Sequence, residues 1–197
     1  MSRQRNTRLA IVGALVAGAL VVAAAVTARG GPTTPATLEA AIASEPLQKV
    51  TDLPSQSGAP RRSMFVQQTS AGFVCTWVAE TATSKLRQGE CNPTEDPLVG
   101  RALWATLTVD GGPALTDVRD ARLIGLAAPE SERVVIEMTD GSVRDAKVRA
   151  AKLDAGVFQA FAYRIKQADL KAGVGPVAVV AYDAAGRQLG HQETGIG

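Results

Sequence analysis

An uninterrupted apolar segment near the start of this 197-residue chain limits its fold more than any other feature. Leu9–Ala28 contains twenty residues with no charged side chain and one hydroxyl group. At 1.5 Å per residue, a helix of this length crosses the roughly 30 Å hydrocarbon layer of a membrane. Such a helix also satisfies its own backbone polar groups, as lipid requires. The segment therefore predicts one transmembrane helix, with the lipid bilayer as its partner.

Charge predicts the orientation of this helix. Arg3, Arg5 and Arg8 precede it, with no acidic residue among them, and positive flanks stay on the cytoplasmic side. We expect residues 1–8 to be a cytoplasmic basic arm and the C-terminal region to be extracytoplasmic at the cell membrane. A cleaved signal peptide is the alternative, because residues 26–28 resemble a small-residue cleavage site. Cleavage after Ala28 would give a secreted protein.

Composition narrows the function classes. The net charge is +2, and without the three N-terminal arginines 18 basic residues face 19 acidic ones. This balance excludes the basic surface of a nucleic-acid-binding domain. A single histidine argues against a His-based metal centre, and phosphate-binding loops are missing. We therefore predict no catalytic residue, no cofactor, no metal ligand and no enzymatic activity.

Residues 29–62 have the composition of a linker. They hold five of the ten prolines, together with several glycines and serines, which favour turns and extended chain. A short helix is expected over residues 38–43, capped by Thr37 and ended before Pro46. We interpret this region as a spacer between the membrane and a folded body at 63–197.

The body shows the period-two alternation of β-strands. Phe73, Cys75 and Trp77 fall on one side of a strand that a turn at 69–72 joins to residues 64–68. A second hairpin is predicted around Asp140 and Gly141, with a type I′ turn. We expect further strands at 103–109, 122–126, 133–138, 142–148, 157–163, 177–182 and 187–191, and a helical turn at 168–171.

Short strands at intervals of eight to twelve residues predict a mainly β protein. We expect an antiparallel β-sandwich of immunoglobulin-like type. Residues 63–118 and 119–197 are candidate sub-units, and the sequence leaves open whether they share one core.

Cys75 and Cys91 are the only cysteines, with fifteen residues between them. Outside the membrane, oxidising surroundings permit a disulfide, and two cysteines allow one pairing. Closing a loop of this size contributes about 3 kcal/mol in the chain-entropy picture. Free thiols and a redox or metal pair are the alternatives, although the spacing is not that of a Cys-x-x-Cys motif.

Other candidate groups for chemistry have simpler interpretations. His191 would need a nucleophile and an orienting acid to act as a base, and we interpret it as an exposed residue of the last strand. The densest acidic spots lie in predicted loops, where solvated charge is the default. Arg61-Arg62 and Arg119–Arg122 are too short or too mixed in sign to form a basic patch. The candidate partners of His191 are Asp183, Glu193 and Ser142. The acidic pairs are Glu95 with Asp96, Asp117 with Asp120, and Glu130 with Glu132.

The apolar segment, the Pro/Gly linker, the Cys75-to-Cys91 unit and the strand-turn ending at 177–186 resemble a group of uncharacterised actinobacterial envelope proteins. Arginine outnumbers lysine 15 to 6, and this composition is similar to that of the same group. The resemblance implies a cell-surface location and no site residues. We therefore expect a binding, structural or sensory module of the cell envelope, whose ligand is an envelope protein or a polysaccharide. The alternatives are a secreted binding domain and an envelope hydrolase.

Overall fold

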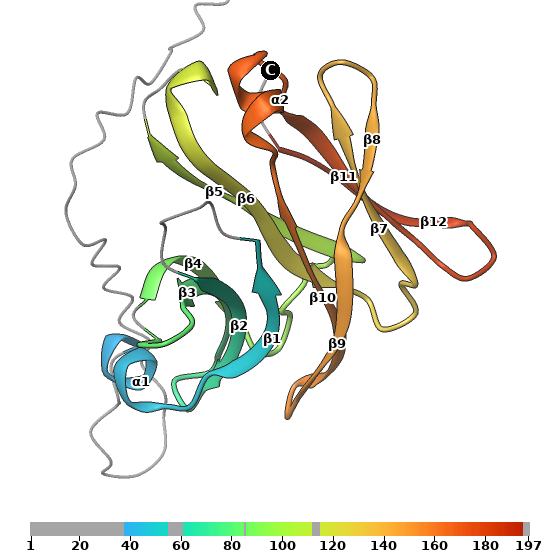
Figure 1. The fold of residues 1–197 in the computed structure, drawn as a ribbon. Helices are drawn as coiled ribbons and strands as arrows, with labels where there is room; N and C mark the ends of the chain where they lie inside the picture. The colour runs from blue at the N-terminus through green and yellow to red at the C-terminus, as the bar shows by residue number, and fades with distance from the viewer. Residues whose placement is uncertain (1–37, 55–60, 85, 112–114, 195–197) are drawn as a thin grey trace, which may run out of the picture. The chain divides into compact units, whose positions relative to one another are not determined.

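The computed structural model describes residues 38–54, 61–84, 86–111 and 115–194 (Figure 1). In these ranges the chain forms three four-stranded sheets, and all strand pairings are antiparallel. The predicted mainly β class is confirmed. No helix in the described ranges is long and apolar enough to cross a membrane. The segment predicted to do so, Leu9–Ala28, lies outside them.

Sheet A contains the N-terminal strands in chain order. A short helix, α1 (Leu38–Ser44), precedes it, as the sequence predicts. The hairpin predicted at residues 64–78 forms between the second and third strands. The strands are β1 (Gln48–Leu53), β2 (Arg62–Thr69), β3 (Phe73–Glu80) and β4 (Leu86–Pro93).

The N-terminal boundary of the folded region differs from the sequence interpretation. The sequence predicts a spacer over residues 29–62, whereas β1 pairs with β2 from Gln48↔Val66 to Leu53↔Arg62. The described part of α1 also packs on the sheet, since Ala41 is buried. The buried side chain of Gln67 on β2 donates from Nε2 to the carbonyls of Glu45 (2.9 Å) and Ile42 (3.3 Å). These carbonyls at the end of α1 would otherwise lack helical partners.

Sheets B and C contain the C-terminal strands. Sheet B has the order β5-β6-β10-β9, and sheet C the order β12-β11-β7-β8. A 3-10 turn, η1 (Leu115–Asp117), precedes β6, and a short helix, α2 (Gln167–Lys171), follows β10. The strands are β5 (Leu103–Gly111), β6 (Val118–Ala127), β7 (Arg133–Met138), β8 (Val143–Asp145), β9 (Lys147–Leu153), β10 (Gly156–Arg164), β11 (Pro176–Tyr182) and β12 (Gln188–Glu193).

Strand pairing crosses the sub-unit boundary that the sequence suggests at 118/119. β5 precedes this position and β6 follows it, yet they pair along their length, from Leu103↔Ala127 to Gly111↔Val118. The single strand expected at 142–148 is also divided. β8 belongs to sheet C, β9 begins sheet B, and only Ala146 separates them.

Sheet B is the middle layer, because both of its faces are buried. Leu123 and Phe161 share one hydrophobic cluster with Ile136 and Val179 of sheet C. The neighbouring residue Ile124 belongs to a second cluster on the opposite face, which includes Met64 and Val66 of sheet A. Successive strand residues point to opposite faces. The apolar run at 123–127 therefore contributes to two cores at once.

The free edges of sheets B and C meet at β5 and β12. The side-chain amide of Gln192 on β12 accepts a hydrogen bond from the N–H of Ala105 (2.9 Å) and donates one to its carbonyl (2.8 Å). A glutamine side chain thus occupies the place of a neighbouring strand. Gly190 lies close by, where an added Cβ would be 3.0 Å from Leu103 Cβ.

Three hairpins use the same three-residue loop. The third loop residue is a glycine with positive φ, and its N–H donates to the carbonyl three residues earlier. In the loop after β7, Gly141 has a φ of +76°, whereas Asp140 does not have a positive φ. The predicted type I′ turn is therefore wrong, because that turn needs two positive φ values. The three glycines are Gly72, Gly141 and Gly186.

Candidate functional site

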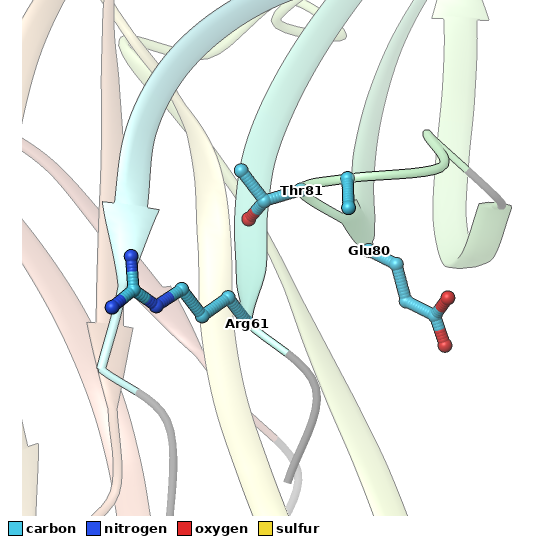
Figure 2. Close-up of a pocket in the computed structure, with 4 residues that line it drawn as sticks. Arg61, Glu80 and Thr81 are labelled. Carbon is cyan, nitrogen blue, oxygen red and sulfur yellow. The ribbon is translucent and has the colours of Figure 1, made fainter.

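A pocket of about 400 Å³ opens where β2 begins and β3 ends. Arg61, Glu80, Thr81 and Ala82 line it. The backbone N–H of Thr81 donates to the carbonyl of Arg61 at 2.9 Å, which fixes the two walls relative to each other. Figure 2 shows the Arg61 side chain extending toward β1, while the Glu80 carboxylate points the opposite way. The pocket thus has a guanidinium and a carboxylate on different sides.

A chain of hydrogen bonds lies behind the pocket. Ser63 Oγ donates to Asp52 Oδ1 at 2.7 Å and is 2.7 Å from Thr81 Oγ1. Because Ser63 uses its proton on Asp52, Thr81 must donate to Ser63. The free lone pair of Thr81 Oγ1 can then accept a hydrogen bond from a ligand. Lys49 and then Ser63, as hydrogen-bond donors, hold the pKa of Asp52 below its usual value.

The hydrogen-bonded group of Asp52, Ser63 and Thr81 does not have the arrangement of a nucleophilic site. Ser63 is fully buried, and a serine nucleophile needs a base such as histidine to remove its proton. His191 lies on β12 of sheet C, with sheet B between it and sheet A. The arrangement can hold a polar ligand by hydrogen bonds and charge.

A cluster of charged residues lies between sheets A and B, and we call it the arginine cluster. Three arginines surround the carboxylate of Asp120 on β6. Arg62 Nη1 of β2 is 3.0 Å from Oδ2, Arg122 Nη2 of β6 is 2.5 Å from Oδ2, and Arg164 Nε of β10 is 2.9 Å from Oδ1. Asp110 of β5 lies at the rim, 3.8 Å from Arg62.

The strand register explains why these side chains meet. Arg122 lies opposite both Thr108 and Arg164, and Asp120 lies opposite Asp110. All of these residues therefore share the face of sheet B that packs against sheet A. Arg62 occupies the same face of β2 as the core residues Met64 and Val66, because alternate residues share a face.

Burial dominates the electrostatics of the arginine cluster. The Arg122 side chain is only 4% exposed, and its Nε has no hydrogen-bond partner. Burial lowers the pKa of Arg122 to about 10, and the attraction of Asp120 offsets only part of this effect. The guanidinium stays charged at neutral pH, so an incompletely balanced positive charge lies between the sheets.

The structure separates the sequence candidates for acid–base chemistry. The Asp183 carboxylate accepts hydrogen bonds from Arg187 and Ala185 in its own turn. Ser142 hydrogen-bonds to Asp140, also within one loop. Within the described ranges, no group of three His, Cys, Asp or Glu residues could hold a metal ion. Glu193 lies on β12 with His191, and Glu95, Asp96, Asp117, Glu130 and Glu132 lie outside the strands.

Asp120 is the acidic candidate that departs from expectation. The sequence predicts a solvated charge in a loop at this position, whereas Asp120 lies on β6 and its side chain is 12% exposed. The sequence predicts no basic patch at Arg61-Arg62 or at Arg119–Arg122, whereas Arg62 and Arg122 both contact the carboxylate of Asp120. The alternation of β6 could have placed Asp120 and Arg122 on a buried face, because they share that face with the apolar Ile124 and Leu126.

The predicted disulfide between Cys75 and Cys91 is present. The two residues lie directly opposite each other on β3 and β4, with Cα atoms 4.0 Å apart. Cys75 is fully buried.

Comparisons of the chain with protein-family models, with curated proteins and with solved structures find no match. The resemblance to actinobacterial envelope proteins therefore stays a prediction.

Proposed function

We propose that this chain is a single-pass membrane protein that presents a binding module of the cell envelope outside the membrane. Leu9–Ala28 would be the anchor, residues 1–8 would stay in the cytoplasm, and the sheets would face outward. An envelope protein or a polysaccharide is the proposed partner, and the pocket beside Arg61 and Thr81 is a candidate contact point.

The observation that carries this proposal is the Cys75–Cys91 disulfide. Disulfides persist in oxidising compartments and are rare in the cytosol. A strand-to-strand disulfide supports an extracytoplasmic position for the body. Combined with the twenty uncharged residues from Leu9 to Ala28 and the arginines before them, it favours an N-inside orientation.

We further propose that residues 103–194 are an immunoglobulin-like sandwich. Naming the strands β5 to β12 in chain order as A, B, C, C′, D, E, F and G gives the sheet orders A-B-E-D and G-F-C-C′. Immunoglobulin constant domains have the A-B-E-D sheet opposite a C-F-G sheet, and variable domains extend the latter with C′. Such domains commonly recognise partners through their loops, which supports a binding role.

A secreted binding domain is the second candidate, because residues 26–28 resemble a cleavage site. The two candidates share the folded body and differ in whether the apolar segment is retained. An envelope hydrolase is less favoured, because Ser63 is buried and hydrogen-bonded to Asp52 rather than to a base.

The proposal is tested by expressing the full chain with a C-terminal tag in a bacterium and separating membrane from soluble fractions. We expect the tag in the carbonate-washed membrane fraction, accessible to protease added to spheroplasts, with an intact mass that includes residues 9–28. A mature chain beginning near Arg29 would support secretion and refute the anchor. The matched control is Val16→Arg, which places a charge at the centre of the segment at a cost of about 2.5–3.5 kcal/mol and should weaken insertion.

A further inference from the structure

The arginine cluster has more positive than negative charge. Arg62, Arg122 and Arg164 face one shared carboxylate, that of Asp120. Asp110 adds a second carboxylate, but its side chain is 57% exposed and its nearest oxygen is 3.8 Å from Arg62. The four inner groups therefore carry two positive charges in excess, and Asp110 reduces the excess to one.

The donors of the arginine cluster also exceed its acceptors. Each guanidinium has five N–H groups, while Asp120 offers two oxygens. Arg122 Nε is buried without an acceptor. A salt bridge that merely joined two sheets would need one arginine for one aspartate. Charges held out of water are costly unless they are balanced and hydrogen-bonded.

We propose that the arginine cluster binds the tetrahedral oxyanion of a phosphate or sulfate group. The anion would bind on the solvent side, between the outer edges of Arg62 and Arg164, whose side chains are 18% and 14% exposed. Arg122 would supply a fixed charge behind it. The planar guanidinium matches phosphate oxygens through two parallel hydrogen bonds, and a doubly charged anion matches the excess of the inner groups.

This inference rests on the proposed binding function and names a ligand class for it. The same oxyanion chemistry occurs on a phospholipid headgroup and on a free or polymer-borne phosphate. An anchored body lies near a membrane surface, so both sources are within its reach. The experiment therefore contains one arm for each source.

The first measurement is the thermal stability of the purified full chain in a neutral detergent. Phosphate, sulfate and chloride are titrated at equal ionic strength, because a ligand at free concentration c that binds the folded state stabilises it by RT ln(1 + c/Kd) and so raises its melting temperature. We expect the melting temperature to rise with the logarithm of the phosphate or sulfate concentration, and we expect chloride to have no such effect. The rise must be smaller in Arg164→Gln, because non-specific stabilisation by kosmotropic salts would act equally on both chains. In the second arm, phosphatidylglycerol is added to the detergent micelles without free phosphate. A rise in this arm alone would assign the oxyanion to a lipid headgroup and would also support the proposal.

Three variants connect the effect to the arginine cluster. Arg164→Gln should weaken phosphate binding by about tenfold or more, because it removes a charge-assisted donor pair. Asp110→Asn removes a competing carboxylate and should strengthen binding by about fivefold, the equivalent of one charge at 4 Å in water. Arg133→Gln is the matched control, since Arg133 pairs with Asp145 on the exposed surface of sheet C, and it should leave binding unchanged.

The outcomes are separable. If Arg164→Gln fails to fold, Asp110→Asn still tests the oxyanion site. Its expected result is stronger phosphate binding, which a folding defect cannot produce. Absence of any anion-specific stabilisation of the wild-type chain in either arm would overturn the inference and leave the arginine cluster as a structural ion network. A chain found secreted but still stabilised by phosphate would refute the membrane anchor and not the oxyanion site.

Discussion

Gln67 joins α1 to sheet A, and its replacement provides a sharp test of that packing. The side chain is 1% exposed. Its Nε2 donates to the carbonyls of Glu45 and Ile42, and its Oε1 accepts from Trp77 Nε1 at 3.0 Å. One amide therefore serves both the end of the helix and the indole of β3.

We predict that Gln67→Leu destabilises the protein by about 3 kcal/mol. Leucine has a similar volume, so the main loss is hydrogen bonding. The Trp77 N–H and the Glu45 carbonyl each lose a partner in a part-buried hydrogen bond, at about 2 kcal/mol per group. The added apolar contact of leucine offsets about 1 kcal/mol of this loss. The expected decrease in melting temperature is about 6–12 °C for a chain of this size.

The change is measured by urea unfolding of the purified full chain, followed by tryptophan fluorescence. Hydrogen exchange of residues 41–47 provides a second readout, since α1 should lose protection before the sheets do. The control is Gln188→Leu, at an exposed position of β12. If Gln67→Leu and Gln188→Leu agree within about 0.5 kcal/mol and α1 keeps its protection, the amide does not hold the helix on the sheet.

Three further changes test the turns, the disulfide and the middle sheet. Gly141→Ala should cost about 1–2 kcal/mol, since the φ of +76° is strained for alanine while no atom lies within 4 Å of the new Cβ; Gly141→Asn should cost less in the same urea experiment. Joint replacement of Cys75 and Cys91 by alanine should cost about 3 kcal/mol, and a wild-type melting temperature insensitive to reductant would contradict this. Gly125→Ala should cost about 3 kcal/mol, because the Cβ would be 2.1 Å from the Trp104 carbonyl oxygen and 2.5 Å from Phe161 Cζ. Adding Phe161→Leu should restore only part of the lost stability, because the contact with the backbone carbonyl of Trp104 remains. Full recovery in the double variant would show that this carbonyl is not the obstacle.

The hairpins could be predicted from sequence because their signals are local. Two strands with period-two alternation, joined by a loop that ends in glycine, predict a hairpin. This local pattern is enough to predict the pairing of β2 with β3 and of β11 with β12. The same reasoning missed β1 and β4, which have little alternation. In β1 only Leu53 is buried, and the strand is held by its pairing with β2. In β4, Gly89 lies opposite Trp77, whose ring covers the space where a Cβ would be.

The arginine cluster could not be predicted for a different reason. Arg62 and Asp120 are 58 positions apart, and their meeting depends on the packing of sheet A on sheet B. Neither the length of a strand nor its alternation states which sheet will cover its face. The sequence indicated the composition of each short segment, but their combined charge arises only when two sheets are stacked.

Sheets B and C are joined in different ways at their two edges. At one corner, β8 passes into β9 through a single residue, Ala146, so the sheets are covalently continuous there. At the opposite corner, Gln192 alone supplies the hydrogen bonds described between β12 and β5. The first corner is therefore joined through the backbone, whereas the hydrogen bonds at the second come from one side chain. Without Gln192, the backbone N–H and carbonyl of Ala105 would lack these partners and could pair with a strand from another chain, so this glutamine also protects the edge against edge-to-edge aggregation.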